Sequence, residues 1–232
     1  MVRKELIRRS PLRVLEKSLK QPLQPGELAI VASPKGIGKT GCLVHMATDS
    51  LLQGKHVIHV SFSSRTDHII SWYENIFQEV AKKLNSAMEV HDEIVRNRVI
   101  MNFNQEGTKT SQVLRSLNAM IREGNFAANQ IIVDGYDFWK ATSEDMHLIK
   151  QFALDAGVTV WCSATVRPEN EKIWERNVPP SLRPIEKDID VLISLGEVEG
   201  NILIRLVKDR EEYPKLDLPV RLDPKTLMMV EE

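Results

Sequence analysis

Residues 33–41 hold the side chains of this sequence that are best suited to phosphate chemistry. Ser33-Pro34-Lys35-Gly36-Ile37-Gly38 is followed directly by Lys39-Thr40-Gly41. Glycines let the backbone turn several N–H groups inward, and an amino group and a hydroxyl at the end of such a turn can bind phosphate and a metal ion. We expect Lys39 to reach the terminal phosphates of a nucleotide and Thr40 to bind Mg²⁺.

The flanking residues place this loop between a strand and a helix. Leu28–Ala32 is an apolar run typical of a buried strand, and apolar side chains recur at helical spacing after Thr40. This is the arrangement of a P-loop, whose consensus is G-x-x-x-x-G-K-[ST], with Ser33 in place of the first glycine. The helix N-terminus adds partial positive charge. A glycine turn that merely precedes Lys-Thr is the alternative, and the strand and the helix argue against it.

A second metal ligand is expected at Asp134. The apolar strand Gln130–Asp134 ends in this carboxylate. In a P-loop protein this is the Walker B position, where an aspartate on the neighbouring strand holds a water on Mg²⁺. A strand that simply ends at an Asp-Gly turn is the alternative. The P-loop upstream favours the metal site.

Composition restricts the class of protein. The chain has 232 residues and a formal net charge of -1. That length fits one α/β domain, and that charge gives no overall attraction for nucleic acid or anionic membranes. No apolar run approaches the roughly 20 residues of a membrane helix, and the N-terminus lacks the apolar region of a signal peptide. We expect a cytoplasmic protein with no membrane partner, whose Cys42 and Cys162 are buried thiols.

Residues 1–25 are expected to be a basic N-terminal arm and a short helix, ahead of a single domain at 26–232. Residues 1–9 carry four basic side chains and one acidic one. This favours a solvated arm, with contact to a phosphate backbone or a partner as the alternative. Ser10-Pro11 then starts a short helix that aligns three leucines on one face.

Strands and helices alternate along the domain. Apolar runs predict strands at residues 28–32, 55–62, 99–103, 130–134 and 158–162. The alternation predicts an α/β fold with a mostly parallel sheet covered by helices on both faces. Residues 190–207 predict an antiparallel hairpin, and residues 220–230 predict one or two small strands. Ligands of such sheets bind beyond the carboxyl ends of the strands, which is where we expect Thr40, Ser63, Asp134 and Ser163.

Four stretches, in order, resemble the RecA-like P-loop ATPases, and within them the branch that contains KaiC, RadA and the DnaB helicase. They are Gln24-Pro-Gly-Glu-Leu28, the P-loop with its helix and the strand that follows, Ile131–Asp134, and residues 185–193 with the hairpin that ends in Lys208-Asp-Arg210. The resemblance implies a RecA-like fold with core strand order 5-1-4-3-2 and a C-terminal antiparallel hairpin extension. It also implies ATP and Mg²⁺ as ligands of the P-loop and Asp134.

The resemblance assigns further roles. Ser163 or Thr165 would occupy the position that detects the γ-phosphate. Lys208 and Arg210 are two residues apart on a predicted strand, so both would point to one face. In a homo-oligomer of this family, that pair reaches the nucleotide of the neighbouring subunit, as an arginine finger does. An exposed basic pair at a strand end is the alternative.

One departure from the family concerns catalysis. The branch places one or two glutamates directly after its second strand to orient and deprotonate the attacking water, and this chain has Ser63-Ser64 there. A serine hydroxyl can hold a water but is no base at pH 7, and loss of a general base costs about 10²–10⁴ in rate. Asp67 and Asp137 are candidate substitutes, and neither has the family's spacing.

Three functions remain open. An intact phosphate site without its catalytic carboxylate favours an ATP-binding switch or assembly module with weak or absent hydrolysis. The alternative is an active ATPase that works on nucleic acid or a protein partner, for which Arg65 and Trp174 give thin support. A remote alternative is a small-molecule P-loop kinase, with Arg167, Arg176 and Arg183 on a closing lid.

Overall fold

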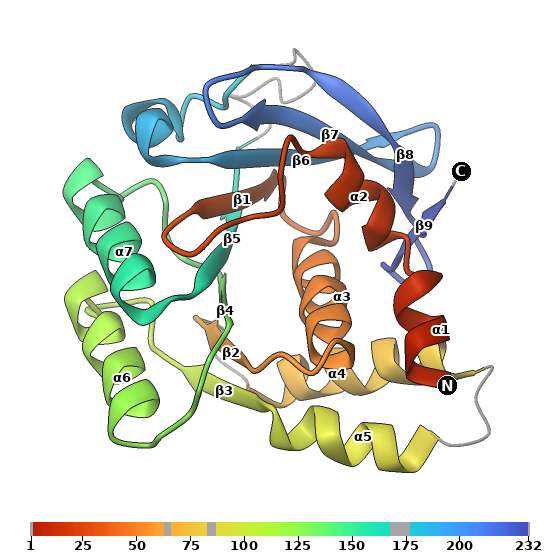
Figure 1. Ribbon diagram of the computed structural model, residues 1–232. Helices are drawn as coiled ribbons and strands as arrows, with labels where there is room; N and C mark the ends of the chain where they lie inside the picture. The colour runs from red at the N-terminus through yellow and green to blue at the C-terminus, as the bar shows by residue number, and fades with distance from the viewer. Residues whose placement is uncertain (1, 63–65, 83–86, 168–176, 232) are drawn as a thin grey trace.

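Nine strands form one sheet in the computed structural model, which describes residues 2–62, 66–82, 87–167 and 177–231 (Figure 1). The strands are β1 (Leu28–Ser33), β2 (Val57–Ser61), β3 (Arg98–Asn102), β4 (Gln130–Asp134), β5 (Thr159–Thr165), β6 (Val191–Val198), β7 (Asn201–Asp209), β8 (Leu216–Leu222) and β9 (Met229–Glu231). The helices are α1 (Val2–Arg8), α2 (Leu12–Ser18), α3 (Lys39–Leu52), α4 (Thr66–Ala81), α5 (Ala87–Arg96), α6 (Thr110–Arg122), α7 (Ser143–Ala156) and the 3-10 helix η2 (Arg183–Asp188).

The sheet is parallel in its centre and antiparallel at one side. Its strand order is β3-β2-β4-β5-β1-β6-β7-β8-β9. In this order across the sheet, each pair of neighbours from β3 through β6 is parallel. Each pair from β6 through β9 is antiparallel. The predictions of an α/β fold, a mostly parallel sheet and a C-terminal hairpin are therefore confirmed.

The expected core order needs a correction. Counted through all the predicted strands, 5-1-4-3-2 is wrong, because β2 rather than β3 pairs with β4. The reason is that β3 pairs only with β2 among the described strands and adds an edge to the sheet instead of entering its centre. When β3 is left out of the count, the order β6-β1-β5-β4-β2 reads 5-1-4-3-2.

Helices cover both faces of the sheet and divide the core into two layers. Helices α6 and α7 lie on one face of the sheet, and α3, α4 and α5 lie on the other (Figure 1). Apolar side chains of α6, α7 and η2 belong to one core layer, and those of α2, α3, α4 and α5 belong to the other. All six residues of β1 are buried, because helices lie on both sides of this strand. The glycine loop at its carboxyl end is thus anchored to a fully buried strand.

The N-terminal residues differ from the expected arm. Val2–Arg8 form α1, and Leu6 and Ile7 pack against the core beside α3. The expectation of a solvated arm is wrong for these two side chains, because their burial outweighs the basic character of their neighbours. The short helix α2 was predicted, and Leu12 and Leu15 on it are buried.

The turn between β8 and β9 sits on the first turns of α3. The N–H of Met229 donates to Nδ1 of His45 at 3.0 Å, and the side chain of Leu227 lies against Gly38 and Gly41. A Cβ atom added to Gly41 would lie 2.8 Å from Cβ and 3.2 Å from the carbonyl oxygen of Leu227. The C-terminal strands therefore form one wall beside the P-loop.

This close approach predicts that Gly41→Ala destabilises the fold by about 1–3 kcal/mol, because the turn must move to admit a methyl group. Leu227→Gly removes the nearest atom and suits the positive φ of 53° at that position. In the Leu227→Gly background, the same Gly41→Ala change should therefore cost clearly less. Urea unfolding of the unaltered protein, the two single variants and the double variant measures the loss of unfolding free energy caused by Gly41→Ala in each background. Equal losses in the two backgrounds would disprove the contact.

Two buried histidines predict acid sensitivity. Burial lowers the pKa of His45 and of His59 from 6.5 to about 4, so the folded state binds protons less readily than the unfolded chain. Their contribution to stability is complete above pH 6.5 and is lost as the pH falls towards 4. As the pH falls from about 7 to about 4.5, the free energy of unfolding should decrease by on the order of 2–3 kcal/mol for each of the two histidines.

The variant His45→Asn separates titration from packing. Asparagine keeps an acceptor for the Met229 N–H but does not titrate, so the variant should lose about half of the pH dependence in urea unfolding. A pH dependence equal to that of the unaltered protein would contradict the assignment.

Candidate functional site

The P-loop has the backbone shape that a phosphate needs. Gly36 and Gly38 adopt φ values of 90° and 112°, in a region that side chains with Cβ rarely occupy. Gly38 caps α3 without a side-chain hydrogen bond, and the first N–H that bonds back to the loop is that of Cys42, to the carbonyl of Gly38 at 2.9 Å. The N–H groups of the preceding residues at the start of α3 therefore remain available to an anion.

Lys39 is folded back over the loop. Its Nζ donates to the carbonyl of Ser33 at 3.0 Å, to Oγ of Ser33 at 3.2 Å and to the carbonyl of Pro34 at 2.8 Å. Burial lowers the pKa of Lys39 from 10.5 to about 8, against the opposite pull of Asp134. These partners are neutral oxygens, so a phosphate would offer the ammonium a stronger, charged acceptor.

Asp134 joins the P-loop to two strands. Its Oδ2 accepts a hydrogen bond from Oγ1 of Thr40 at 2.8 Å, and its Oδ1 accepts one from Oγ of Ser163 at 2.6 Å. The N–H of Gly135 in turn donates to Oγ of Ser163 at 2.8 Å. Three residues predicted from separate motifs are thus brought together by direct hydrogen bonds.

The strand order corrects the expected position of Asp134. We expected this residue on the strand next to β1, but it lies on β4, and β5 stands between β4 and β1. Ser163, on β5, fills the resulting gap by pairing in register with Val31 of β1 and bonding Asp134. The hydroxyl predicted as a γ-phosphate detector therefore also holds the carboxylate in place.

These residues line a cleft of about 420 Å³ at the carboxyl ends of the strands. Of the predicted site residues, the cleft includes Lys35, Gly36, Gly38, Lys39, Thr40, Gly41, Asp134, Asp137, Ser163 and Thr165. Ser33 is buried beneath the loop, Ile37 packs against the core, and Pro34 contributes its carbonyl to Lys39.

The two candidate bases are placed differently. Asp137 lines the cleft, where it accepts the N–H of Trp139 at 3.2 Å and pairs with Lys140 at 3.3 Å. Asp67 is exposed in the first turn of α4 and does not line the cleft. Ser63, Ser64, Arg65, Trp174 and Arg176, which entered the sequence predictions, lie outside the described residues.

Lys208 and Arg210 lie at the opposite end of the sheet. Asp209, between them, is level with Val191 at the start of β6 and so with the amino end of β1. The expectation that the pair shares one strand face is wrong, because β7 ends at Asp209 and Arg210 has a φ of 53°.

Both side chains have partners in their own chain. Nζ of Lys208 donates to the carbonyls of Glu186 and Ile189 at 2.6 and 2.5 Å, and Arg210 pairs with Glu27 at 2.7 Å. A role in a neighbouring subunit would require both to give up these contacts, and it stays a prediction.

Several residues of the cleft were not predicted. Trp72, Phe62, Trp139 and Leu227 line it, and they come from four separate segments. The aromatic run Tyr136–Trp139 after the Walker B strand was a signal that sequence reasoning could have used. Leu227 had none, because its position depends on how the C-terminal strands fold back on α3.

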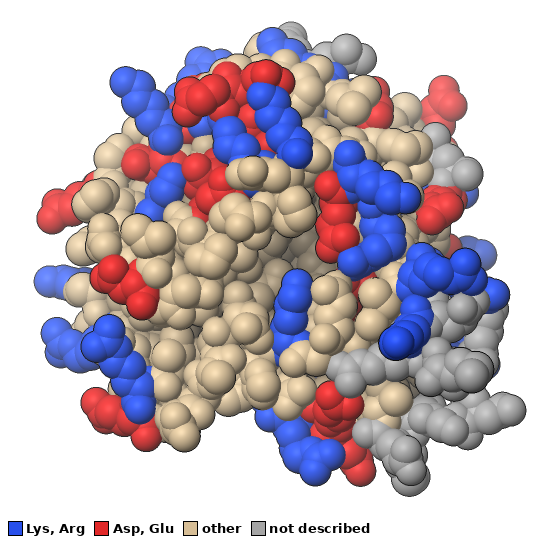
Figure 2. Space-filling view, viewed as in Figure 1, with Lys and Arg blue, Asp and Glu red and all other residues tan. Residues whose placement is uncertain are grey.

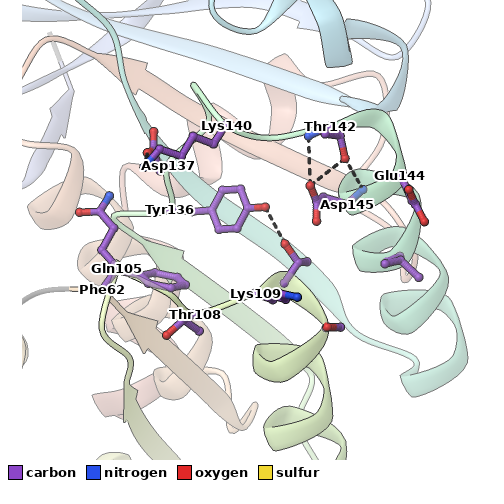
Figure 3. A pocket seen from close by; sticks show the side chains of 13 residues that line it. Phe62, Gln105, Thr108, Lys109, Tyr136, Asp137, Lys140, Thr142, Glu144 and Asp145 are labelled. Atoms are coloured by element: carbon purple, nitrogen blue, oxygen red, sulfur yellow. Dashed lines mark hydrogen bonds and ion pairs between the residues drawn. The ribbon is translucent and has the colours of Figure 1, made fainter.

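A larger cavity of about 570 Å³ adjoins the cleft. Figure 3 shows the side chains that line this cavity. Phe62, Gln105, Tyr136 and Asp137 line both the cavity and the cleft. The hydroxyl of Tyr136 is 2.8 Å from Oγ1 of Thr110, and its ring packs edge-on against Phe62. The remaining wall carries Thr108, Lys109, Ser111, Lys140, Thr142, Glu144, Asp145 and Leu148.

Two features of the described residues bear on surface charge and on membrane-spanning helices. On the face seen in Figure 2, basic and acidic side chains are interspersed. No described helix has the length and apolar character needed to cross a bilayer.

No group of three or more His, Cys, Asp and Glu residues suited to holding a metal occurs within the described part of the chain. Any magnesium held here would therefore need oxygens from phosphate and water in addition to Thr40 and Asp134. Comparison with known proteins adds no relationship, since no protein-family model matches the chain and no curated protein matches it in sequence.

Proposed function

We propose that this protein binds Mg²⁺ and ATP in the cleft above β1, β4 and β5 and acts as a nucleotide-dependent switch or assembly module with weak or absent hydrolysis. The observation that carries the proposal is the set of hydrogen bonds by which Asp134 joins Thr40 and Ser163 beside the P-loop. An Asp-Gly turn at the end of an unrelated strand gives no reason for a bond to the threonine after a glycine loop.

The residues present fit magnesium and a polyphosphate. Mg²⁺ prefers oxygen ligands and is usually held by one or two protein groups together with phosphates and waters. Thr40 and Asp134 supply such oxygens 2.8 Å apart. Lys39 and the free N–H groups at the start of α3 supply the positive partners for the phosphates.

The partners of the carboxylates at the cleft support the proposal of weak hydrolysis. Among the described residues that line it, only Asp134 and Asp137 are acidic. Asp134 is occupied by the hydroxyls of Thr40 and Ser163, and Asp137 by Lys140 and the N–H of Trp139. If a base does act on water, Asp137 is the better placed of the two candidates, because Asp67 lies outside the cleft.

We also propose that the chain is a RecA-like ATPase relative of the KaiC, RadA and DnaB type. The order β6-β1-β5-β4-β2 and the antiparallel strands after β6 support this assignment. An active ATPase with a nucleic acid or protein partner remains the alternative, and a homo-oligomer with Lys208 and Arg210 acting in trans remains part of the family expectation.

Calorimetry with Mg-ATP tests the binding proposal. Lys39→Ala should weaken binding by about ten- to hundredfold, because it removes a charge-assisted contact to phosphate. Lys55→Ala, at an exposed lysine beyond the end of α3, is the matched control and should leave binding unchanged. Thr40→Ala should abolish the benefit of added Mg²⁺, while Thr40→Ser keeps it. Absence of heat and of thermal stabilisation with millimolar Mg-ATP would refute the proposal.

Phosphate release tests the hydrolysis claim. We expect slow steady-state turnover that Asp67→Asn leaves unchanged and that Asp137→Asn lowers further if Asp137 positions water. Rapid turnover that is lost in Lys39→Ala and reduced in Asp67→Asn would favour the active ATPase instead.

Transfer of phosphate to a small molecule is a second candidate, favoured by the cavity of about 570 Å³ that shares a wall with the cleft (Figure 3). A hydroxyl-bearing acceptor there would lie beside the residues that follow Asp134. Radiolabelled Mg-ATP incubated with a panel of sugars, nucleosides and hydroxylated amino acids should yield a labelled product if this is the function. Failure to label any of them would remove the candidate.

A further inference from the structure

We propose that Arg167 binds the terminal phosphate of the nucleotide from within the same chain. This inference rests on the proposed function, and it concerns a residue that lies outside the P-loop and Walker B motifs. Arg167 entered the sequence predictions only as one of three arginines on a kinase lid. The structure gives it a specific position beside the cleft.

The backbone brings Arg167 to the edge of the cleft, next to two residues that line it. β5 carries Ser163 and ends at Thr165, and both residues line the cleft. Arg167 follows two residues later and is exposed. Thr40 and Asp134 would hold a magnesium ion, which would neutralise charge on the terminal phosphates of a nucleotide. The terminal phosphate would therefore lie at the wall that the end of β5 helps to form.

Trp139 holds the guanidinium at this wall. The central guanidinium carbon of Arg167 lies 4.5 Å from the centroid of the Trp139 ring, within the range of a cation–π contact. The indole N–H of Trp139 donates to the carbonyl of Thr165 at 3.3 Å, and Trp139 itself lines the cleft. The arginine is thus stacked on a side chain that forms part of the site.

Within the part of the chain that the structure describes, the charge of Arg167 is not matched by a carboxylate. No described acidic side chain forms an ion pair with it, whereas Lys140 nearby pairs with Asp137 at 3.3 Å. The predicted arginine finger, Arg210, pairs with Glu27 at the other end of the sheet. Lys140 and Arg210 thus each contact a carboxylate, whereas Arg167 contacts an aromatic face. A cation–π contact is weaker than a charge-assisted hydrogen bond to phosphate, so Arg167 is the cation that a phosphate would attract most readily from its present partner.

Arginine suits this role because its planar guanidinium can donate two parallel hydrogen bonds to phosphate oxygens. Such a contact is made by ATP and not by ADP, since it involves the phosphate that ADP lacks. When ATP binds, the guanidinium of Arg167 would leave the ring of Trp139 and contact the terminal phosphate. The ATP-bound and ADP-bound forms of the switch would then differ in the position of this side chain.

Dissociation constants for Mg-ATP and Mg-ADP test the inference. Arg167→Ala should weaken ATP binding by about ten- to hundredfold. Its effect on ADP should stay within about twofold at physiological salt, because exposed charges at a distance are screened. Arg183→Ala is the matched control: Arg183 is exposed and donates to the carbonyl of Val178 at 3.4 Å, and Val178, unlike the Trp139 on which Arg167 stacks, does not line the cleft.

Tryptophan fluorescence supplies a second readout. ATP, but not ADP, should change the emission of Trp139 as the guanidinium leaves its ring, and the change should be absent in Trp139→Phe and in Arg167→Ala. Equal losses for ATP and ADP in Arg167→Ala, or no loss for either, would overturn the role of Arg167 alone. If the unaltered protein binds neither nucleotide nor inorganic triphosphate, the proposed function fails as well.

Discussion

The carboxylate of Asp134, held between the hydroxyls of Thr40 and Ser163, is the interaction on which the rest of this structure depends. It connects the first turn of α3 to the ends of β4 and β5, which are separate in sequence and brought together only by the parallel sheet. A carboxylate that accepts hydrogen bonds from two hydroxyls has its hydrogen-bonding capacity well used. Thr40 and Asp134 both line the cleft, and under the proposed function a magnesium ion and phosphates would compete for their oxygens.

The surrounding residues extend this arrangement in three directions. Lys39 rests on neutral carbonyls of its own loop and so keeps a charge available for a ligand. Leu227 closes the side of the P-loop near Gly41, where the C-terminal turn is held by His45. On the opposite side, the aromatic residues after Asp134 separate the cleft from the larger cavity. Under the proposed function, a site bounded in this way would take a ligand with an anionic part at the loop, and the larger cavity adjoins it.

The sequence predicted the local parts of this site better than their arrangement. The glycine loop at residues 33–41, the strand that ends in Asp134 and the position of Ser163 are each encoded within a few residues, by glycines, apolar runs and a polar side chain at a strand end. Leu227 against Gly41 and Arg167 against Trp139 depend on contacts between distant segments, which no local pattern contains. Arg210 was predicted to point to the same strand face as Lys208, but β7 ends one residue earlier, at Asp209, and the alternation of side chains along a strand no longer applies at Arg210. The strand order was misread for a similar reason, since pairing at the sheet edge decides where β3 goes.

A crystal structure with Mg²⁺ and a non-hydrolysable ATP analogue tests the central claim most directly. The account predicts phosphate oxygens over the N–H groups from Gly36 to Gly41, Nζ of Lys39 moved from the Ser33 and Pro34 carbonyls to phosphate, and magnesium bound at Thr40 beside Asp134. An analogue bound elsewhere, or a cleft in which Thr40 and Lys39 keep their present partners at saturating analogue, would contradict it.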